Sequence, residues 1–314
     1  MTTRYKPEGT RLATPQNREY ISSGVSGLER ALDKQVILEA PAILCDHNFN
    51  LHISLGGGVS GIIPREECEF ISSGESVKDI AILTRVGKPV CFKVIGFERA
   101  ENGGTVAVLS RRAAQRECFL NYVSTLRSGD IIPARVTHLE SFGAFVDIGC
   151  GIISLLSIDC ISVSRIAHPG ARLSVGDSLF AVVKSIDERG RVYVTERELL
   201  GSWEENVSRF SEGETVSGIV RSVESYGIFV ELTPNLAGLA EFKENVYPEQ
   251  TAAVYIKSII PEKMKIKLII IDTTDEPIYR KPLEYFIDPT ETARIDRWTY
   301  SPRGSRKLIE SSFT

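Results

Sequence analysis

Between residues 141 and 149, apolar and polar positions alternate along the sequence Ser-Phe-Gly-Ala-Phe-Val-Asp-Ile-Gly. Alternation with a period of two predicts a β-strand with one buried face. The inward positions are aliphatic, namely Ala144, Val146 and Ile148. The other face carries Phe145 and Asp147, and because a carboxylate is costly to bury without a partner, we expect that face to be exposed. A large aromatic ring on an exposed sheet face is a candidate binding residue.

The same arrangement recurs in two other parts of the chain. Residues 225–232 place Phe229 beside Glu231 and opposite aliphatic positions. Residues 48–56 form a fainter copy, in which His52 takes the outward parity. Self-similarity of this kind predicts an array of modules.

Apolar runs of strand length, separated by turn signals, predict three consecutive blocks. The runs are 36–38, 42–44, 51–55, 90–97 and 105–109 in the first block, 131–137, 178–186 and 191–195 around the second aromatic strand, and 215–220, 251–260 and 264–271 around the third. A helical link is predicted over 111–126. A sheet this small leaves exposed edges unless it closes, so the sequence predicts an all-β protein of tandem OB-fold, five-stranded barrels with short linking helices.

The expected division of the chain follows these blocks. It comprises an N-terminal arm with a short helix from Ser26 (1–33), a degenerate barrel (34–116), a helical linker (117–128), a second barrel (129–199), a linker (200–212), a third barrel (213–272) and a C-terminal extension (273–314). The extension interleaves positive and aromatic residues, a pattern that suits either single-stranded RNA or packing onto the third barrel. We favour packing.

Charge and cysteine content narrow the class of protein. The 37 Lys and Arg residues nearly balance 41 Asp and Glu residues, for a net charge of −4, which excludes nucleic-acid binding by bulk charge alone. The six cysteines form no C-x-x-C pair and no secretory signal is present, so we expect a cytoplasmic protein with reduced thiols. Apolar runs such as 266–271 are too short to span a bilayer, and we expect no membrane contact.

Several stretches resemble the S1 RNA-binding domain family, and the array resembles the ribosomal protein S1 family of bacteria. The stretches are 129–136, 141–149, 175–177, 185–187 and 190–192, with 58–64 and 108–112 in the first block. The resemblance covers residues 34–271 and implies S1-type OB barrels. In that family the RNA-facing surface consists of two aromatic residues on strand two, a histidine on strand three, and an acidic and a basic residue near strands four and five.

In the second block, the resemblance places the two aromatic residues at Phe142 and Phe145. Ser157 stands at the histidine position, which departs from the family pattern. Asp187 and Arg191 occupy the acidic and basic positions. The second block is therefore the best candidate RNA platform.

In the third block, the aromatic residues fall at Tyr226 and Phe229, and Lys265 lies near the basic position. Glu241 replaces the histidine, and Ile260 replaces the acid. The first block has Phe49 and, at the second aromatic position, His52, so it is the most degenerate of the three.

The chemistry of these residues suits single-stranded RNA, whose unpaired bases stack on aromatic rings while cations follow the phosphates. Phe142 and Phe145 are three positions apart, so a regular strand would place them on opposite faces. Gly143, and Gly227 in the third block, permit a bend that brings both rings to one side. The alternative is that Phe142 and Tyr226 plug a barrel end and contact no ligand.

Other motifs in the chain do not support a dinucleotide site, a metal site or a catalytic site. Residues 56–61 match G-x-G-x-x-G, but Ile62-Ile63-Pro64 follows where a dinucleotide site needs a helix. Asp46, His47 and His52 lack the spacing of a closed metal site. No G-x-S-x-G, H-E-x-x-H or G-x-x-x-x-G-K motif occurs, so the sequence predicts no enzyme, no cofactor, no metal and no small-molecule substrate.

The function expected from the sequence is binding of single-stranded RNA, or mRNA, by tandem S1-type domains in translation near the small ribosomal subunit. The first barrel would then dock protein. One alternative is a protein-interaction scaffold of degenerate OB repeats, and another is a non-catalytic accessory of RNA processing. RNA binding that weakens as the salt concentration rises would distinguish the RNA-binding function from the protein-interaction scaffold.

Overall fold

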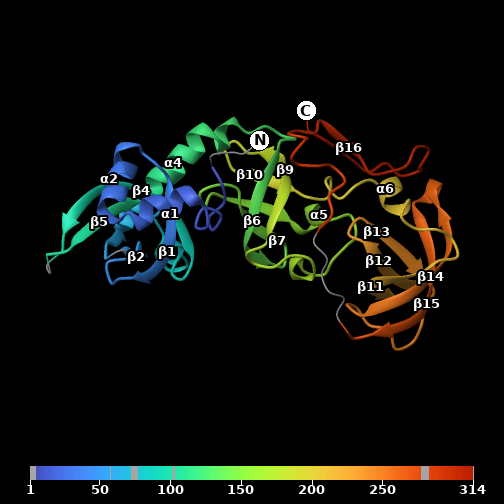
Figure 1. Ribbon diagram of the computed structural model, residues 1–314. Coiled ribbons are helices and arrows are strands. Elements are labelled where there is room, and N and C mark those ends of the chain that lie inside the picture. The colour runs from blue at the N-terminus through green and yellow to red at the C-terminus, as the bar shows by residue number, and fades with distance from the viewer. Residues whose placement is uncertain (1–4, 57, 72–76, 101–102, 277–282, 314) are drawn as a thin grey trace.

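The computed structural model describes residues 5–56, 58–71, 77–100, 103–276 and 283–313. These residues form three closed five-stranded barrels in a row, joined by short helices (Figure 1). In each barrel the first strand pairs with the second and the fourth, and the third strand pairs in parallel with the fifth. The predicted all-β class of tandem OB-type barrels is therefore confirmed.

The first barrel is preceded by two helices. Its elements are α1 (Pro15–Ser22), α2 (Gly24–Asp33), β1 (Leu38–Cys45), β2 (Leu51–Ser54), β3 (Ser60–Ile63), η1 (Arg65–Glu67), α3 (Asp79–Leu83), β4 (Pro89–Arg99) and β5 (Thr105–Ser110). Of the runs 36–38 and 42–44, predicted as separate strands, only Leu38 of the first belongs to a strand, and it lies in the same strand, β1, as the whole of the second. Residues 38–41 of β1 pair with β4 and residues 42–45 with β2, so Pro41, which has no N–H to donate, lies where the strand changes partner. Helix α2 starts at Gly24, two residues before the predicted start.

In the second and third barrels the predicted strands lie close to their expected positions, and each barrel has one more strand, the third, for which no run was predicted. The second has β6 (Ile131–Glu140), β7 (Gly143–Asp147), β8 (Ile153–Ser157), α5 (Ile158–Ile161), η3 (Pro169–Ala171), β9 (Ser178–Ile186) and β10 (Val192–Thr195). The third has β11 (Thr215–Glu224), β12 (Gly227–Thr233), β13 (Leu236–Ala240), β14 (Thr251–Ile260), η4 (Pro261–Lys263) and β15 (Lys265–Thr274). The links are α4 (Arg111–Asn121) with η2 (Val123–Thr125), and α6 (Trp203–Val207). Helix α6 begins with a capping box between Ser202 and Glu205.

The C-terminal extension packs onto the third barrel, as predicted, and also onto the second, which the sequence did not predict. Its strands β16 (Arg297–Thr299) and β17 (Glu310–Ser312) form a two-stranded sheet. Trp298 and Tyr300 are buried in the core of the third barrel, and Phe313 is buried against Val182 of the second. The extension, red in Figure 1, therefore joins two barrels.

Residues 5–12, expected in the N-terminal arm, run between the first and second barrels. The backbone N–H of Glu8 donates to Asp147 Oδ2 on β7 at 2.6 Å. The Glu8 carboxylate accepts from Arg111 Nε on α4 at 2.7 Å and from the Cys91 N–H on β4 at 3.0 Å. One short segment thus connects both barrels and the helix between them.

The expectation that Asp147 faces solvent is wrong, since only 1% of the residue is exposed. Besides Glu8, the backbone N–H groups of Gly149 and Gly151 donate to its carboxylate at 2.7 and 3.0 Å. Burial, together with the nearby Glu8 carboxylate, raises the pKa of Asp147 to about 8, although these three N–H donors favour the ionised form. Its polar surroundings make burial tolerable.

Glu231 occupies the position in the third barrel that is equivalent to Asp147, and it is also buried with polar partners around its carboxylate. Arg172 of the second barrel contacts its carboxylate at 2.8 Å, and Arg221 on β11 contacts it at 2.9 Å. These two guanidinium groups lower the pKa of Glu231, although its burial raises it. The triad of Arg172, Glu231 and Arg221 therefore links the second barrel to the third.

Candidate nucleic-acid interface

A row of side chains crosses all five strands on the outer face of the second barrel. Cross-strand partners connect His138 on β6 to Phe145 on β7, Phe145 to Leu155 on β8, Leu155 to Tyr193 on β10, and Tyr193 to Ser185 on β9. Directly opposed residues of neighbouring strands lie side by side on one face of a sheet. Phe145 is half-buried and stays open to solvent even though Asp147 on the same face is covered. We call these five residues the middle row.

Phe142 joins the middle row at one end. It lies in the two-residue turn between β6 and β7 and is 53% exposed, and its ring meets Phe145 edge-on with 6.0 Å between ring centroids. The predicted meeting of the two rings is therefore observed, although it arises from the turn. Gly143 is required by close packing, since a Cβ there would lie 2.5 Å from the carbonyl oxygen of Leu156 on β8. Phe142 does not plug the barrel.

His138 is a member of the row that the sequence did not single out. Its ring stacks on Phe145 with 6.3 Å between centroids and 22° between planes. Its Nε2 lies 2.8 Å from Glu140 Oε1. A turn of two residues at 141–142 pairs residue 140 with 143 and hence 138 with 145, and this hairpin count is the signal that would have found His138.

Asp187 and Arg191 come together at the turn between β9 and β10. Arg191 Nε lies 2.7 Å from Asp187 Oδ2, and the Arg191 side chain is 62% exposed. The backbone N–H of Arg191 and its guanidinium lower the pKa of Asp187. An exposed ion pair of this kind contributes little, so the guanidinium is available to an anionic ligand at small cost. Arg191 precedes Tyr193 of the middle row by two residues.

Ser157 lines a cavity of about 260 Å³ beside the middle row. The cavity is also lined by Leu155, Tyr193 and Lys184, whose Nζ lies 3.1 Å from Cys160 Sγ. Ser157 pairs with Gly143 across β7 and β8, and its hydroxyl contacts the Asp159 carboxylate. Hydroxyl and ammonium groups therefore stand where the resemblance implies a histidine.

The third barrel repeats the row with two changes of residue type, Ser222 for His138 and Lys267 for Tyr193. Its members are Ser222, Phe229, Leu239, Lys267 and Ser258, each the cross-strand partner of the next. Tyr226 is 69% exposed in the turn before β12, and its ring meets Phe229 edge-on with 6.2 Å between centroids.

The charged residues of the third barrel lie partly apart from this row. Lys267, which sequence reasoning missed, takes the place of Tyr193, whereas the predicted Lys265 lies at the exposed start of β15. Glu241 is exposed, 3.8 Å from Lys257 Nζ. The cation within the row is therefore Lys267.

The first barrel carries an apolar row instead. The equivalent partners are Leu44, His52, Ile62, Val108 and Gly96. Phe49 packs against the core with its ring under the Arg65 guanidinium, 4.9 Å from the centroid, and His52 Nε2 lies 3.3 Å from Asp46 Oδ2. The structure does not bring Phe49 and His52 together into an open aromatic pair.

The part of the chain that the structure describes contains no cluster of three or more His, Cys, Asp or Glu side chains arranged to hold a metal ion. Over the same residues, no helix is both long and apolar enough to cross a membrane.

The closed barrels define a tandem OB-fold protein in which two barrels carry an exposed aromatic pair on their outer face. Residues 125–196, the second barrel with its entry, match the model of the S1 RNA binding domain family. The resemblance to the S1 family noted in the sequence is therefore confirmed for this barrel.

Relatives extend the likeness beyond the second barrel. The chain is 26% identical over 245 residues to small ribosomal subunit protein bS1 of Rhizobium meliloti (strain 1021), an alignment that covers 72% of this chain and 41% of that protein. It is also 26% identical over 267 residues to small ribosomal subunit protein bS1 of Staphylococcus aureus (strain COL), covering 78% of this chain and 64% of that one. The chain thus spans about half the length of these relatives. Among solved structures, a multidomain protein with nucleic acid binding domains from Streptococcus pneumoniae TIGR4 is 15% identical, with 78% of this chain and 76% of that chain covered and a TM-score of 0.25.

Proposed function

We propose that the chain binds single-stranded RNA on the outer rows of its second and third barrels. The observation that carries this proposal is the middle row, in which Phe145 has an edge-on aromatic neighbour, Phe142, on one side and a stacked histidine, His138, on the other. Bases of any sequence stack on such rings, and nearby cations such as Arg191 follow the backbone. In the third barrel Phe229 and Lys267 supply the same two elements.

The cellular setting that we propose is translation in the cytoplasm, with mRNA as the ligand and the small ribosomal subunit as the partner. Two curated relatives are small ribosomal subunit proteins, and both alignments span more than one barrel of this chain. No catalytic step and no cofactor form part of the proposal.

We assign protein docking, in place of RNA, to the outer row of the first barrel. Leu44 of its row is 53% exposed and its neighbour Ile43 60%, and the five described residues of the row include no aromatic pair and no Lys or Arg. An exposed apolar row favours a protein partner over a charged strand. Protein binding, the alternative function considered from the sequence, is thus proposed for one barrel only.

Binding of labelled RNA over a salt series tests the proposal. Fluorescence anisotropy with mixed-sequence single-stranded RNA of about 20 nucleotides is expected to show affinity falling with salt, at about 0.7 logarithmic units per phosphate contact. A duplex of the same sequence should bind more weakly, since its bases are not free to stack. A scaffold that binds only proteins would show no RNA binding at any salt concentration, and that result would refute the proposal.

A further inference from the structure

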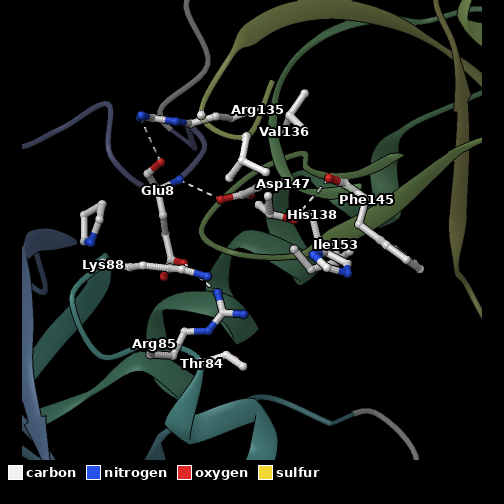
Figure 2. A pocket seen from close by; sticks show the side chains of 14 residues that line it. Glu8, Thr84, Arg85, Lys88, Arg135, Val136, His138, Phe145, Asp147 and Ile153 are labelled. Carbon is white, nitrogen blue, oxygen red and sulfur yellow. Dashed lines mark hydrogen bonds and ion pairs between the residues drawn. The ribbon is translucent and has the colours of Figure 1, made fainter. Parts of the chain in front are cut away.

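A cavity of about 500 Å³ opens between the first and second barrels, next to the middle row. Residues 84–89, between α3 and the start of β4, form one wall, and residues 135–138 of β6 with part of β7 form the other (Figure 2). His138 and Phe145 belong both to the middle row and to the wall of this cavity. The stacking surface therefore continues into the gap between the barrels without a break.

Three cations from two barrels line this groove, namely Arg85, Lys88 and Arg135. Lys88 is exposed and makes no ion pair with any carboxylate among the described residues. Arg135 donates to the backbone carbonyl of Glu8 at 3.4 Å, so this contact leaves its charge uncompensated. Figure 2 shows Lys88 and Arg135 on opposite sides of the groove.

The acidic groups of the groove are largely compensated. Glu8 is held by Arg111 Nε at 2.7 Å, with Arg85 at 3.7 Å from the same carboxylate. Asp147 is buried under backbone N–H donors. An anion entering the groove therefore meets more available positive than negative charge.

The rest of the groove wall suits the uncharged parts of a nucleotide. Val175 is 59% exposed and Ile153 40% exposed, and both line the cavity. Apolar walls with cations at the rim match a chain of riboses and bases whose phosphates alternate along one edge.

The groove is held in its shape by the segment around Glu8. Its contacts with Cys91 on β4, Arg111 on α4 and Asp147 on β7 fix the two walls relative to each other. A site that is already formed loses less conformational freedom on binding than one that must be assembled.

We infer that a single RNA strand stacked on the middle row continues into this groove, where Lys88 and Arg135 contact its phosphates, so that the first two barrels bind one strand jointly. The inference rests on the proposed function and names a subsite of it. It gives the first barrel a contribution to RNA binding from its α3–β4 connection, on a different surface from its apolar row.

The test compares Lys88→Ala and Lys88→Glu with Lys34→Ala in the full chain. Lys34 is an exposed lysine of the same barrel, at the end of α2, and does not line the groove. With single-stranded RNA of about 20 nucleotides, Lys88→Ala is expected to weaken binding about threefold to tenfold and to reduce the salt slope by about 0.7, the contribution of one phosphate contact. Lys88→Glu should weaken binding further, and Lys34→Ala should bind as the wild type does.

Oligonucleotide length separates this inference from the proposed function. RNA of about 5 nucleotides, near the lower limit for one OB barrel, should bind the wild type and Lys88→Ala with the same affinity, because it covers the middle row alone. The inference is overturned if the long RNA binds both Lys88 variants with wild-type affinity and salt slope while Phe145→Ala weakens it. If the wild type binds neither RNA, the proposed function itself fails.

Discussion

Replacing Phe145 with alanine is the most direct perturbation of the middle row. The Phe145 side chain lies outside the buried core clusters, so its loss should change the melting temperature only slightly. Stacking of one base on one aromatic ring contributes about 1–3 kcal/mol, which corresponds to a change of about 5-fold to 150-fold in Kd. Because Phe142 and His138 both contact the Phe145 ring, at 6.0 and 6.3 Å between centroids, its removal also frees these two neighbours. We therefore expect a loss in the upper half of that range.

The assay is fluorescence anisotropy with single-stranded RNA at fixed salt, alongside thermal melting of each variant. Phe145→Tyr keeps the aromatic face and should retain near-wild-type affinity. Phe145→Leu keeps apolar bulk without an aromatic face and should lose most of what Phe145→Ala loses. If the leucine variant binds RNA as tightly as the wild type, the ring acts through packing alone and the stacking mechanism is refuted.

Further predictions concern the contacts that hold the barrels together, and each is measured by chemical denaturation. Glu231→Ala leaves Arg172 buried without this carboxylate and Arg221 with Glu249 alone, and should lower the free energy of unfolding by about 3–5 kcal/mol, whereas an unchanged midpoint would show that the triad carries no net stability. Trp298→Ala should cost about 3–5 kcal/mol because the ring is buried in the third barrel, and a cost below about 1 kcal/mol would mean that the extension does not anchor there. Burial raises the pKa of Glu196 from 4.5 to about 8, so between those values this group holds a proton in the native state that it has lost in the unfolded state, and its contribution to stability should fall as pH rises, by at most about 1.4 kcal/mol per pH unit. Asp147, whose pKa is likewise raised to about 8, changes wild-type stability in the same direction. Glu196→Gln should show a flatter profile over that window, and identical profiles would exclude Glu196 as the group that titrates.

The fold was largely predictable because its signals are local. Strands β9 and β14 span the residues that apolar runs predict, and the repeated aromatic strand indicated the module before any contact was known. The burial of Asp147 was not predictable in this way. Parity assigns a residue to a face of the sheet, but the segment that covers Asp147 comes from Glu8, 139 positions away along the chain.

The residues of the candidate site were likewise only partly predictable from the sequence. The aromatic positions follow from the resemblance, whereas Tyr193 and Lys267 enter their rows through the parallel pairing of the third and fifth strands. The position of the fifth strand also depends on where β-bulges shift its register against the fourth, as between Tyr193 and Val194 or between Ile256 and Ser258. A single sequence does not reveal the position of a bulge, so the row members on the third, fourth and fifth strands require the structure, whereas His138 follows from the hairpin count.

The N-terminal segment has a practical consequence for dissecting the chain. A fragment that begins at residue 125, where the family match starts, would contain Asp147 and Cys150 but would lack their partners. The N–H of Glu8 would no longer reach the carboxylate, and the carbonyl of Lys6 would no longer accept from the Cys150 N–H, a bond of 2.9 Å in the intact chain. Measurements on such a truncated protein would describe a second barrel that has lost its contacts with Lys6 and Glu8. A minimal fragment that preserves the second barrel as it is in the intact chain must therefore retain the first barrel as well.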